Sequence, residues 1–162
     1  MSRLDSFIRR MQAQRTCLDW AAGAVAGMPG PILELGLGNG RTYDHLREIL
    51  PDRDIYVFDR RIAAHPDCIP PVEFMILGEV AETLPQAVDR LGRSAAMVHT
   101  DLGTGDAQAN AVLAGIVGPL LAALVAPGGI IVANHALTVP VWSALPEPEG
   151  VNPGRYFLYR AE

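Results

Sequence analysis

The stretch Ile32–Thr42, which reads ILELGLGNGRT, joins a short apolar run to a helical pattern through three glycines. Residues 32–35 are typical of a buried strand, and residues 41–50 have helical spacing. Glycines at 36, 38 and 40 permit a tight turn and let backbone N–H groups approach a ligand closely. The helix that follows presents its positive amino end to the same place. The stretch therefore predicts a strand–loop–helix unit with a ligand site at the loop.

The spacing of these glycines differs from the spacing in a dinucleotide-binding loop. A G-x-G-x-x-G pattern would place its third glycine at position 41, where the chain has Arg41. Glu34, two residues before Gly36, is also foreign to that pattern. A carboxylate at this point is well placed to meet a cationic group, such as an amine. A nicotinamide enzyme is therefore disfavoured.

Outward from this stretch, apolar runs alternate with helical patterns. The runs predict strands, the helical spacing predicts helices, and repeated strand–helix–strand units imply a parallel sheet covered on both faces. We expect a doubly wound, mainly parallel α/β fold. The expected strands are 32–35, 55–58, 73–77, 95–99, 130–133 and 155–160, with 138–142 a further candidate; the expected helices are 3–26, 41–50, 79–91 and 106–125; and 127–129 is an expected turn.

Composition narrows the classes of function. The chain has 162 residues, a net charge of −5 and 49% hydrophobic residues, which fits one domain with a real core and excludes a disordered chain. A pI near 5.3 gives no support to an electrostatic nucleic-acid binder. The two cysteines fit a reducing compartment, and the first residues do not resemble a secretion signal, so a cytoplasmic location is expected.

One long segment raises the question of a membrane. Residues 107–146 contain no Asp, Glu, Lys or Arg, and residues 111–126 are almost wholly apolar. A buried helix followed by a buried strand of a parallel sheet explains this pattern better than a spanning helix. We therefore expect no membrane association.

Acidic residues follow the second and third expected strands. In an open parallel sheet, ligands bind at the carboxyl ends of the strands. Asp59 ends the second strand, where a carboxylate can accept both hydroxyls of a ribose. Gly78-Glu79 follows the third strand and places a further acceptor beside that point.

Polar residues also follow the fourth and fifth expected strands. Asp101 comes after the fourth strand and would line the same cleft. Asp106 is better explained as the N-cap of the next helix. Asn134 and His135 follow the fifth strand.

Taken together, these residues resemble the class I, Rossmann-like S-adenosylmethionine-dependent methyltransferases. The ELGLGNG segment resembles that family's first motif, Asp59 its ribose-binding acid and Gly78-Glu79 its adenine-contacting step. Asp101 stands at the fourth motif, and APGG at 126–129 is similar to a common sixth one. The resemblance covers residues 31–137. The whole chain further resembles a short bacterial subfamily whose methyl acceptor we do not know.

The resemblance implies a cofactor and a set of site residues. The cofactor is S-adenosyl-L-methionine, and Asp101 and His135 are candidates for orienting or deprotonating the acceptor. The residues expected to contact the cofactor are Glu34, Gly36, Gly38, Asn39, Gly40, Thr42, Asp59, Arg60, Gly78, Glu79 and Asp101.

Two departures from the family pattern bear on the acceptor. Asp101 is followed by LGTG and not by the N/D-P-P-Y/F signature of amino-group methylation on nucleic acid or glutamine. We therefore expect a small-molecule acceptor and no nucleic-acid partner. The short remainder after His135 also implies abbreviated terminal strands. The chain then reads as one domain: an N-terminal helix at 1–27, a cofactor-binding core at 31–137 and shortened strands at 138–162.

Two alternatives to a simple methyltransferase stay open at this point. One is a non-catalytic, regulatory S-adenosylmethionine-binding module. The other is a metal-assisted O-methyltransferase using Asp101, Asn134 and His135, which is a weak ligand set for magnesium, so no metal is expected. We also expect a homo-oligomer, formed through the N-terminal helix or through an apolar sheet edge around Val139, Val141 and Trp142.

Overall fold

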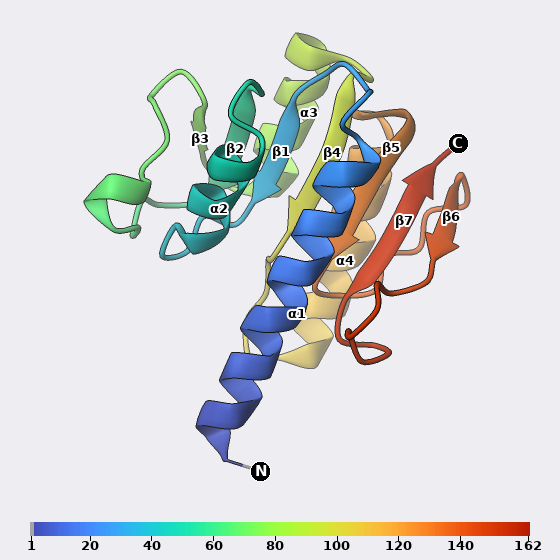
Figure 1. The fold of residues 1–162 in the computed structure, drawn as a ribbon. Helices are drawn as coiled ribbons and strands as arrows, with labels where there is room; N and C mark the ends of the chain where they lie inside the picture. The colour runs from blue at the N-terminus through green and yellow to red at the C-terminus, as the bar shows by residue number, and fades with distance from the viewer. Residues whose placement is uncertain (1) are drawn as a thin grey trace.

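A seven-stranded sheet organises the protein in the computed structural model, which describes residues 2–162 (Figure 1). The strand order is β3-β2-β1-β4-β5-β7-β6, and only β7 runs antiparallel to its neighbours. The expected doubly wound, mainly parallel fold is confirmed. The strands are β1 (Ile32–Leu35), β2 (Ile55–Asp59), β3 (Met75–Leu77), β4 (Ala95–Thr100), β5 (Val125–Ala133), β6 (Trp142–Leu145) and β7 (Phe157–Ala161).

Helices cover both faces of the sheet. Helices α1 and α2 lie on one face and α3 and α4 on the other, as Figure 1 shows. Each face has its own apolar core, and β1, β4 and residues 129–133 of β5 are buried between the two. The helices are α1 (Arg3–Ala24), α2 (Arg41–Ile49), α3 (Val80–Leu91) and α4 (Ala107–Ala122), with a short 3-10 helix η1 (Pro66–Cys68).

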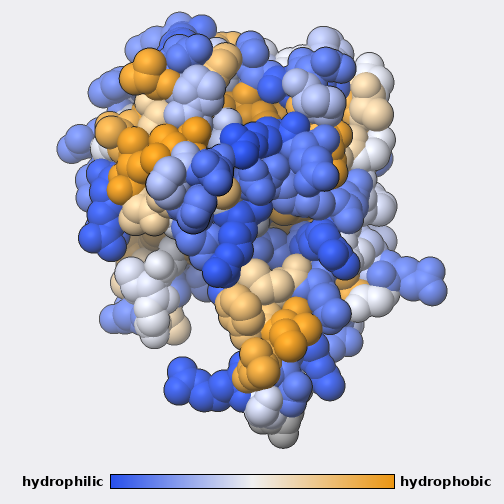
Figure 2. Space-filling model, turned by 60° about the vertical axis from the view of Figure 1, so that its left-hand side comes forward, coloured by the Kyte–Doolittle hydropathy of each residue, from blue (hydrophilic) through white to orange (hydrophobic). Residues whose placement is uncertain are grey.

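Helix α1 is buried along only part of its length. Its start is fixed by a capping box, in which the Asp5 N–H donates to Ser2 Oγ at 3.0 Å and the Ser2 N–H donates to Asp5 Oδ2 at 3.1 Å. The carboxyl-terminal half packs on the sheet, whereas the amino-terminal half projects beyond the carboxyl ends of the parallel strands. Leu4, Phe7 and Ile8 are exposed on this half, and Figure 2 shows an apolar patch on the projecting end.

The end of the chain completes the sheet without a further helix. Among the described residues no helix follows α4, and the two terminal strands are short, as expected. The candidate strand at 138–142 is wrong, because β6 begins only at Trp142. The expected turn at 127–129 is also wrong. Those residues lie inside β5, whose pairing with β4 shifts between Ala95 and Met97 to accommodate them.

The apolar edge expected at this end is mostly covered by the chain itself. Val139 and Trp142 are buried, and the Trp142 ring packs against Tyr159 with centroids 5.8 Å apart. Only Val141 of the three is exposed.

Among residues 2–162 there is no helix with both the length and the apolar content to cross a membrane.

Candidate functional site

The glycine loop between β1 and α2 is shaped by close backbone contacts. Gly36 has a φ of +93°, and a Cβ there would lie 2.8 Å from the carbonyl oxygen of Asp101. Gly40 has a φ of +86°, and its Cβ would lie 2.5 Å from the Cβ of Cys68. Gly38 faces open space. Glycine is therefore needed at 36 and 40 for packing, while 38 leaves the ligand side open.

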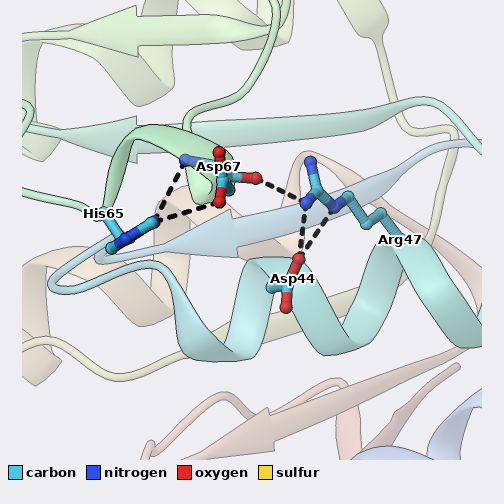
Figure 3. Close-up of polar contacts among 4 residues, drawn as sticks. All are labelled: Asp44, Arg47, His65 and Asp67. Carbon is cyan, nitrogen blue, oxygen red and sulfur yellow. Dashed lines mark hydrogen bonds and ion pairs between the residues drawn. The ribbon is translucent and has the colours of Figure 1, made fainter.

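The segment after β2 holds the glycine loop from outside. The Arg47 guanidinium on α2 lies 2.6 Å from Asp44 and donates to the carbonyl oxygen of Asp67 (Figure 3). The Asp67 N–H donates to His65 Nδ1 at 3.2 Å, and the His65 N–H donates to the carbonyl oxygen of Asn39 at 3.2 Å. These contacts tie η1 to α2 and to the loop.

Asp59, at the end of β2, links the second strand to the loop. Its Oδ2 accepts the N–H groups of Leu37 at 2.8 Å and Gly38 at 3.2 Å. Among residues 2–162, its Oδ1 accepts only the Arg61 N–H, at 3.3 Å. One carboxylate oxygen therefore fixes the loop, while the other keeps accepting capacity for a ligand hydroxyl.

Glu34 is fully buried and does not face the cleft. Its carboxylate accepts a hydrogen bond from Thr42 Oγ1 and lies 2.7 Å from His99 Nδ1, which is also fully buried. Burial lowers the pKa of His99, but the charge and hydrogen bond of Glu34, together with the charge of Asp101, outweigh this effect. The pKa of His99 is therefore raised overall. Among the described residues His99 Nε2 has no hydrogen-bond partner. Glu34 thus anchors the start of α2 from within.

A cleft of about 410 Å³ opens at the carboxyl ends of β1, β2 and β4. Arg60 and Glu79 form an exposed ion pair at its rim, with 3.9 Å between Nη1 and Oε1. Asn39 and Thr42 lie on a smaller adjoining hollow instead, and Glu34, Gly40 and Gly78 do not line the cleft. The expected site residues that do line it are Gly36, Gly38, Asp59, Arg60, Glu79 and Asp101.

A second hollow, of about 400 Å³, lies on the other side of Asp101 and contains His135. Asp101, Gly103 and Thr104 line both cavities. Gln14 Nε2 on α1 donates to Asp101 Oδ2 at 3.0 Å, which orients the carboxylate. A Cβ on Gly103 would lie 2.9 Å from His135 Nε2. The structure thus brings the two candidate catalytic residues to one hollow.

Several residues of this site were missed by sequence reasoning. Gln14 is a polar residue on the buried stripe of α1, and His99 is a polar residue inside an apolar strand; both are signals that could have been read. Asn110 is nine-tenths buried and holds Thr104 through backbone bonds of 2.7 and 2.8 Å. No local pattern relates Arg10 to Arg155, since only the fold brings them together at the second hollow.

Metal-ligating side chains do not gather at this site. No group of three or more His, Cys, Asp or Glu side chains able to hold a metal ion occurs among residues 2–162. The Asn134 amide nitrogen donates to the Leu102 carbonyl oxygen at 2.9 Å, so its side chain supports the loop.

The strand order, the glycine loop and the acid at the end of β2 define the class of Rossmann-like S-adenosylmethionine-dependent methyltransferases. The family model described as S-adenosyl-L-methionine methyltransferase matches residues 1–161, and the chain belongs to this family. The protein is therefore a methyltransferase that uses S-adenosylmethionine. No curated protein matches the sequence.

Solved structures agree with this assignment. An S-adenosyl-L-methionine methyl transferase from Silicibacter pomeroyi DSS-3 is 46% identical, with a TM-score of 0.95, over 100% of this chain and 99% of that one. Two more distant structures share the fold alone. Human methyltransferase-like protein 13, in complex with SAH, has 11% identity and a TM-score of 0.58 over 93% of this chain and 81% of that one. A 16S rRNA adenine methyltransferase variant from Catenulisporales acidiphilia has 17% identity and a TM-score of 0.52 over 89% and 90%.

Proposed function

We propose that the protein transfers the methyl group of S-adenosylmethionine to a small molecule bound in the second hollow, beside Asp101 and His135. The observation that carries this proposal is the shared wall of the two cavities. Asp101, Gly103 and Thr104 line both the cleft of about 410 Å³ and the hollow of about 400 Å³. A ligand in one therefore faces a ligand in the other, and volumes of this size suit small molecules.

The cofactor fits the first cleft by the chemistry of its lining. Asp59 Oδ1, which keeps accepting capacity beside its 3.3 Å bond from the Arg61 N–H, would accept the ribose hydroxyls, and Glu79 at the rim would accept from the adenine amine. Gly36 and Gly38 would lie along the methionine part, because Gly38 leaves open space there. Glu34, which the sequence placed in contact with that part, would act indirectly by holding Thr42 and the start of α2.

Positioning is the main task of the protein in this reaction. S-adenosylmethionine, when bound, supplies a methyl group already activated by a positive sulfur. The protein aligns the acceptor with that group and excludes water. Asp101, oriented by Gln14, would hold the acceptor's reacting atom, and His135 would take its proton where one must leave.

The non-catalytic binding module and the metal-assisted O-methyltransferase are the two alternatives to this proposal. The family assignment makes the protein an enzyme and removes the non-catalytic module. For the metal-assisted reaction, the ligands would be Asp101, Asn134 and His135, and one carboxylate with one amide oxygen and one imidazole is a weak set for magnesium. We expect full activity in excess chelator, and its loss there would revive the metal-assisted reaction.

The experiment uses S-adenosylmethionine with a labelled methyl group. The enzyme is incubated separately with a small-molecule extract of bacterial cells, with total RNA and with total protein. We expect label in the small-molecule fraction only; label in RNA would refute the proposed acceptor class. Asp101→Asn and His135→Gln should each lower turnover by about 100-fold. His45→Gln, on α2 outside both cavities, is the control.

We also propose a homo-oligomer, with the projecting end of α1 in the contact. Leu4 is 66% exposed, and Phe7 and Ile8 are each 43% exposed on the same helix. The sheet edge is a weaker candidate, since Val139 and Trp142 are buried within the chain. Light scattering should give more than one chain mass, and Leu4→Ser should reduce it; a monomer at micromolar concentration would contradict the proposal. The cytoplasmic location stays a prediction.

A further inference from the structure

We propose that the acceptor carries an anionic group, a carboxylate or a phosphate, which the second hollow binds through Arg10 and Arg155. This inference rests on the proposed function and narrows its acceptor. The two arginines come from opposite ends of the chain. Arg10 lies on the projecting half of α1 and Arg155 just before β7, and both line the hollow.

Neither guanidinium is occupied by an acidic partner. Among residues 2–162, the ion pairs include neither Arg10 nor Arg155. Arg10 lies over the Phe7 ring, 5.9 Å from its centroid. By contrast, Arg53 and Arg93 donate to backbone carbonyl oxygens and serve the fold. Two arginines that converge on a hollow without such partners are available to a ligand.

The loop that carries Arg155 is folded before any ligand binds. The Gly154 N–H donates to Glu147 Oε1 at 2.9 Å, which lowers the pKa of that carboxyl. The Arg155 N–H donates to the carbonyl oxygen of Asn152 at 3.2 Å. Arg155 is itself half-buried. A loop held in this way costs little ordering on binding.

The remaining polar groups divide the hollow into two ends. Asp101 is the one carboxylate among the described lining residues, and it lies where the hollow meets the cofactor cleft. Arg155 and Tyr156 line the hollow but not that cleft. Burial and the charge of Asp101 raise the pKa of the Tyr156 phenol, so it stays protonated and can donate. Arg155 is thus set apart from the reacting end, whereas Arg10 lies nearer to it, because Arg10 and Asp101 also line the smaller adjoining hollow.

Guanidinium groups suit the class of ligand proposed. Each presents a planar fork of N–H donors that matches the oxygens of a carboxylate or phosphate. The protein as a whole carries a net charge of −5, so general attraction of anions does not account for such a site. The acceptor's anionic group would be held at Arg10 and Arg155, and its nucleophilic atom would reach Asp101 and the methyl group.

The test uses simple probes on the enzyme loaded with S-adenosylhomocysteine. Acetate, inorganic phosphate and neutral acetamide are titrated separately while the side-chain N–H signals of arginine are followed by NMR. We expect saturable shifts at Arg10 and Arg155 with one or both anions, at a Kd of about 1–10 mM, and none with acetamide. Acetate or phosphate as the tighter probe distinguishes the two kinds of acceptor.

Matched variants decide whether the arginines form a site. Arg10→Gln and Arg155→Gln should each weaken anion binding about 10-fold or more. Arg155→Gln, which lines neither the cofactor cleft nor the smaller hollow beside the glycine loop, should leave the affinity for S-adenosylmethionine unchanged by calorimetry. Arg9→Gln is the control, because it removes the same charge from an exposed neighbour that does not line the hollow. Equal weakening by Arg9→Gln, or no saturation by either anion below about 50 mM, would overturn the inference.

The labelled-methyl experiment keeps this inference separate from the proposed function. If label enters small molecules that an anion exchanger does not retain, the anionic acceptor is wrong while the small-molecule reaction stands. If label enters RNA or protein, the proposed function itself fails.

Discussion

Replacing Asp59 by asparagine would separate its structural role from its proposed role in cofactor binding. In the structure, Oδ2 accepts from the N–H groups of Leu37 and Gly38, and Oδ1 accepts from the Arg61 N–H at 3.3 Å. In Asp59→Asn the amide oxygen can replace Oδ2 and keep the glycine loop in place. The amide NH2 then replaces Oδ1, which removes the acceptor proposed for the ribose hydroxyls.

The size of the effect follows from the bonds that are lost. A hydrogen bond to an ionised group contributes about 1.5–3 kcal/mol, and two ribose hydroxyls would lose their carboxylate acceptor together. A loss of about 3 kcal/mol in binding free energy corresponds to a Kd about 100-fold higher. Retention of the loop contacts should hold the free energy of unfolding within about 1 kcal/mol of wild type.

Calorimetric titration with S-adenosylmethionine and with S-adenosylhomocysteine measures this prediction. Circular dichroism and thermal unfolding check that the variant is folded. Asp89→Asn, an exposed change of the same kind on α3, is the control and should bind like wild type. A folded Asp59→Asn protein with a Kd within about 3-fold of wild type would refute the placement of the ribose.

Three further predictions concern stability and reactivity. In Gly36→Ala the new Cβ would lie 2.8 Å from a carbonyl oxygen at a φ of +93°, so the free energy of unfolding should fall by about 1–3 kcal/mol. Gly23→Ala in α1 should instead raise the free energy of unfolding by about 0.5–1 kcal/mol. Denaturant titration measures both changes, and equal effects would contradict the packing argument. The raised pKa of His99 adds stability that is fully present below the unfolded pKa of about 6.5 and is lost as pH rises through the folded pKa. The unfolding free energy should therefore fall by up to about 1.4 kcal/mol per pH unit in that window, a slope that His99→Gln should lack; identical slopes would show that His99 does not bind its extra proton in the folded state. Burial raises the pKa of the Cys17 thiol to about 11, so iodoacetamide at pH 8 should label half-buried Cys68 and leave Cys17 unlabelled until the protein unfolds. Peptide mass spectrometry measures the labelling of each cysteine. Early labelling of Cys17 would mean that α1 opens in the native state.

Local pattern predicted the central part of the fold. Strands β1, β2 and β4 are mostly apolar runs followed by glycine or acidic residues, and these signals lie within or next to the segment itself. The pattern found residues 130–133 of β5 but missed the first part of this strand, because Pro127-Gly128-Gly129 is typical of a turn. Pairing with β4, through a shift in register, keeps that segment in the sheet. Such a contact lies far away in sequence and has no local sign.

The candidate site also combines residues that local sequence pattern predicts with residues that only the complete fold brings together. The acids and glycines that line the first cleft follow strands directly, so their convergence could be inferred from topology. Glu34 has the right position in the pattern, but its carboxylate is taken by His99, which lies on a neighbouring strand. Arg10 and Arg155 reach the second hollow from the two ends of the chain, and Gln14 contacts Asp101 in its wall. No spacing rule relates residues whose proximity arises only when the whole sheet has formed.

The construction of α1 bears on how this enzyme can change its substrate. Its carboxyl-terminal half is part of the hydrophobic core, while Arg10 and Phe7 on the other half lie beside the cavities. The part of the wall that α1 contributes is therefore the end of a helix whose other end is fixed in the core, and it faces the loops that carry Asp101 and Arg155. Exposed positions on that end can vary without disturbing the core. We expect related enzymes to acquire different acceptors by changing a few side chains along this one helix.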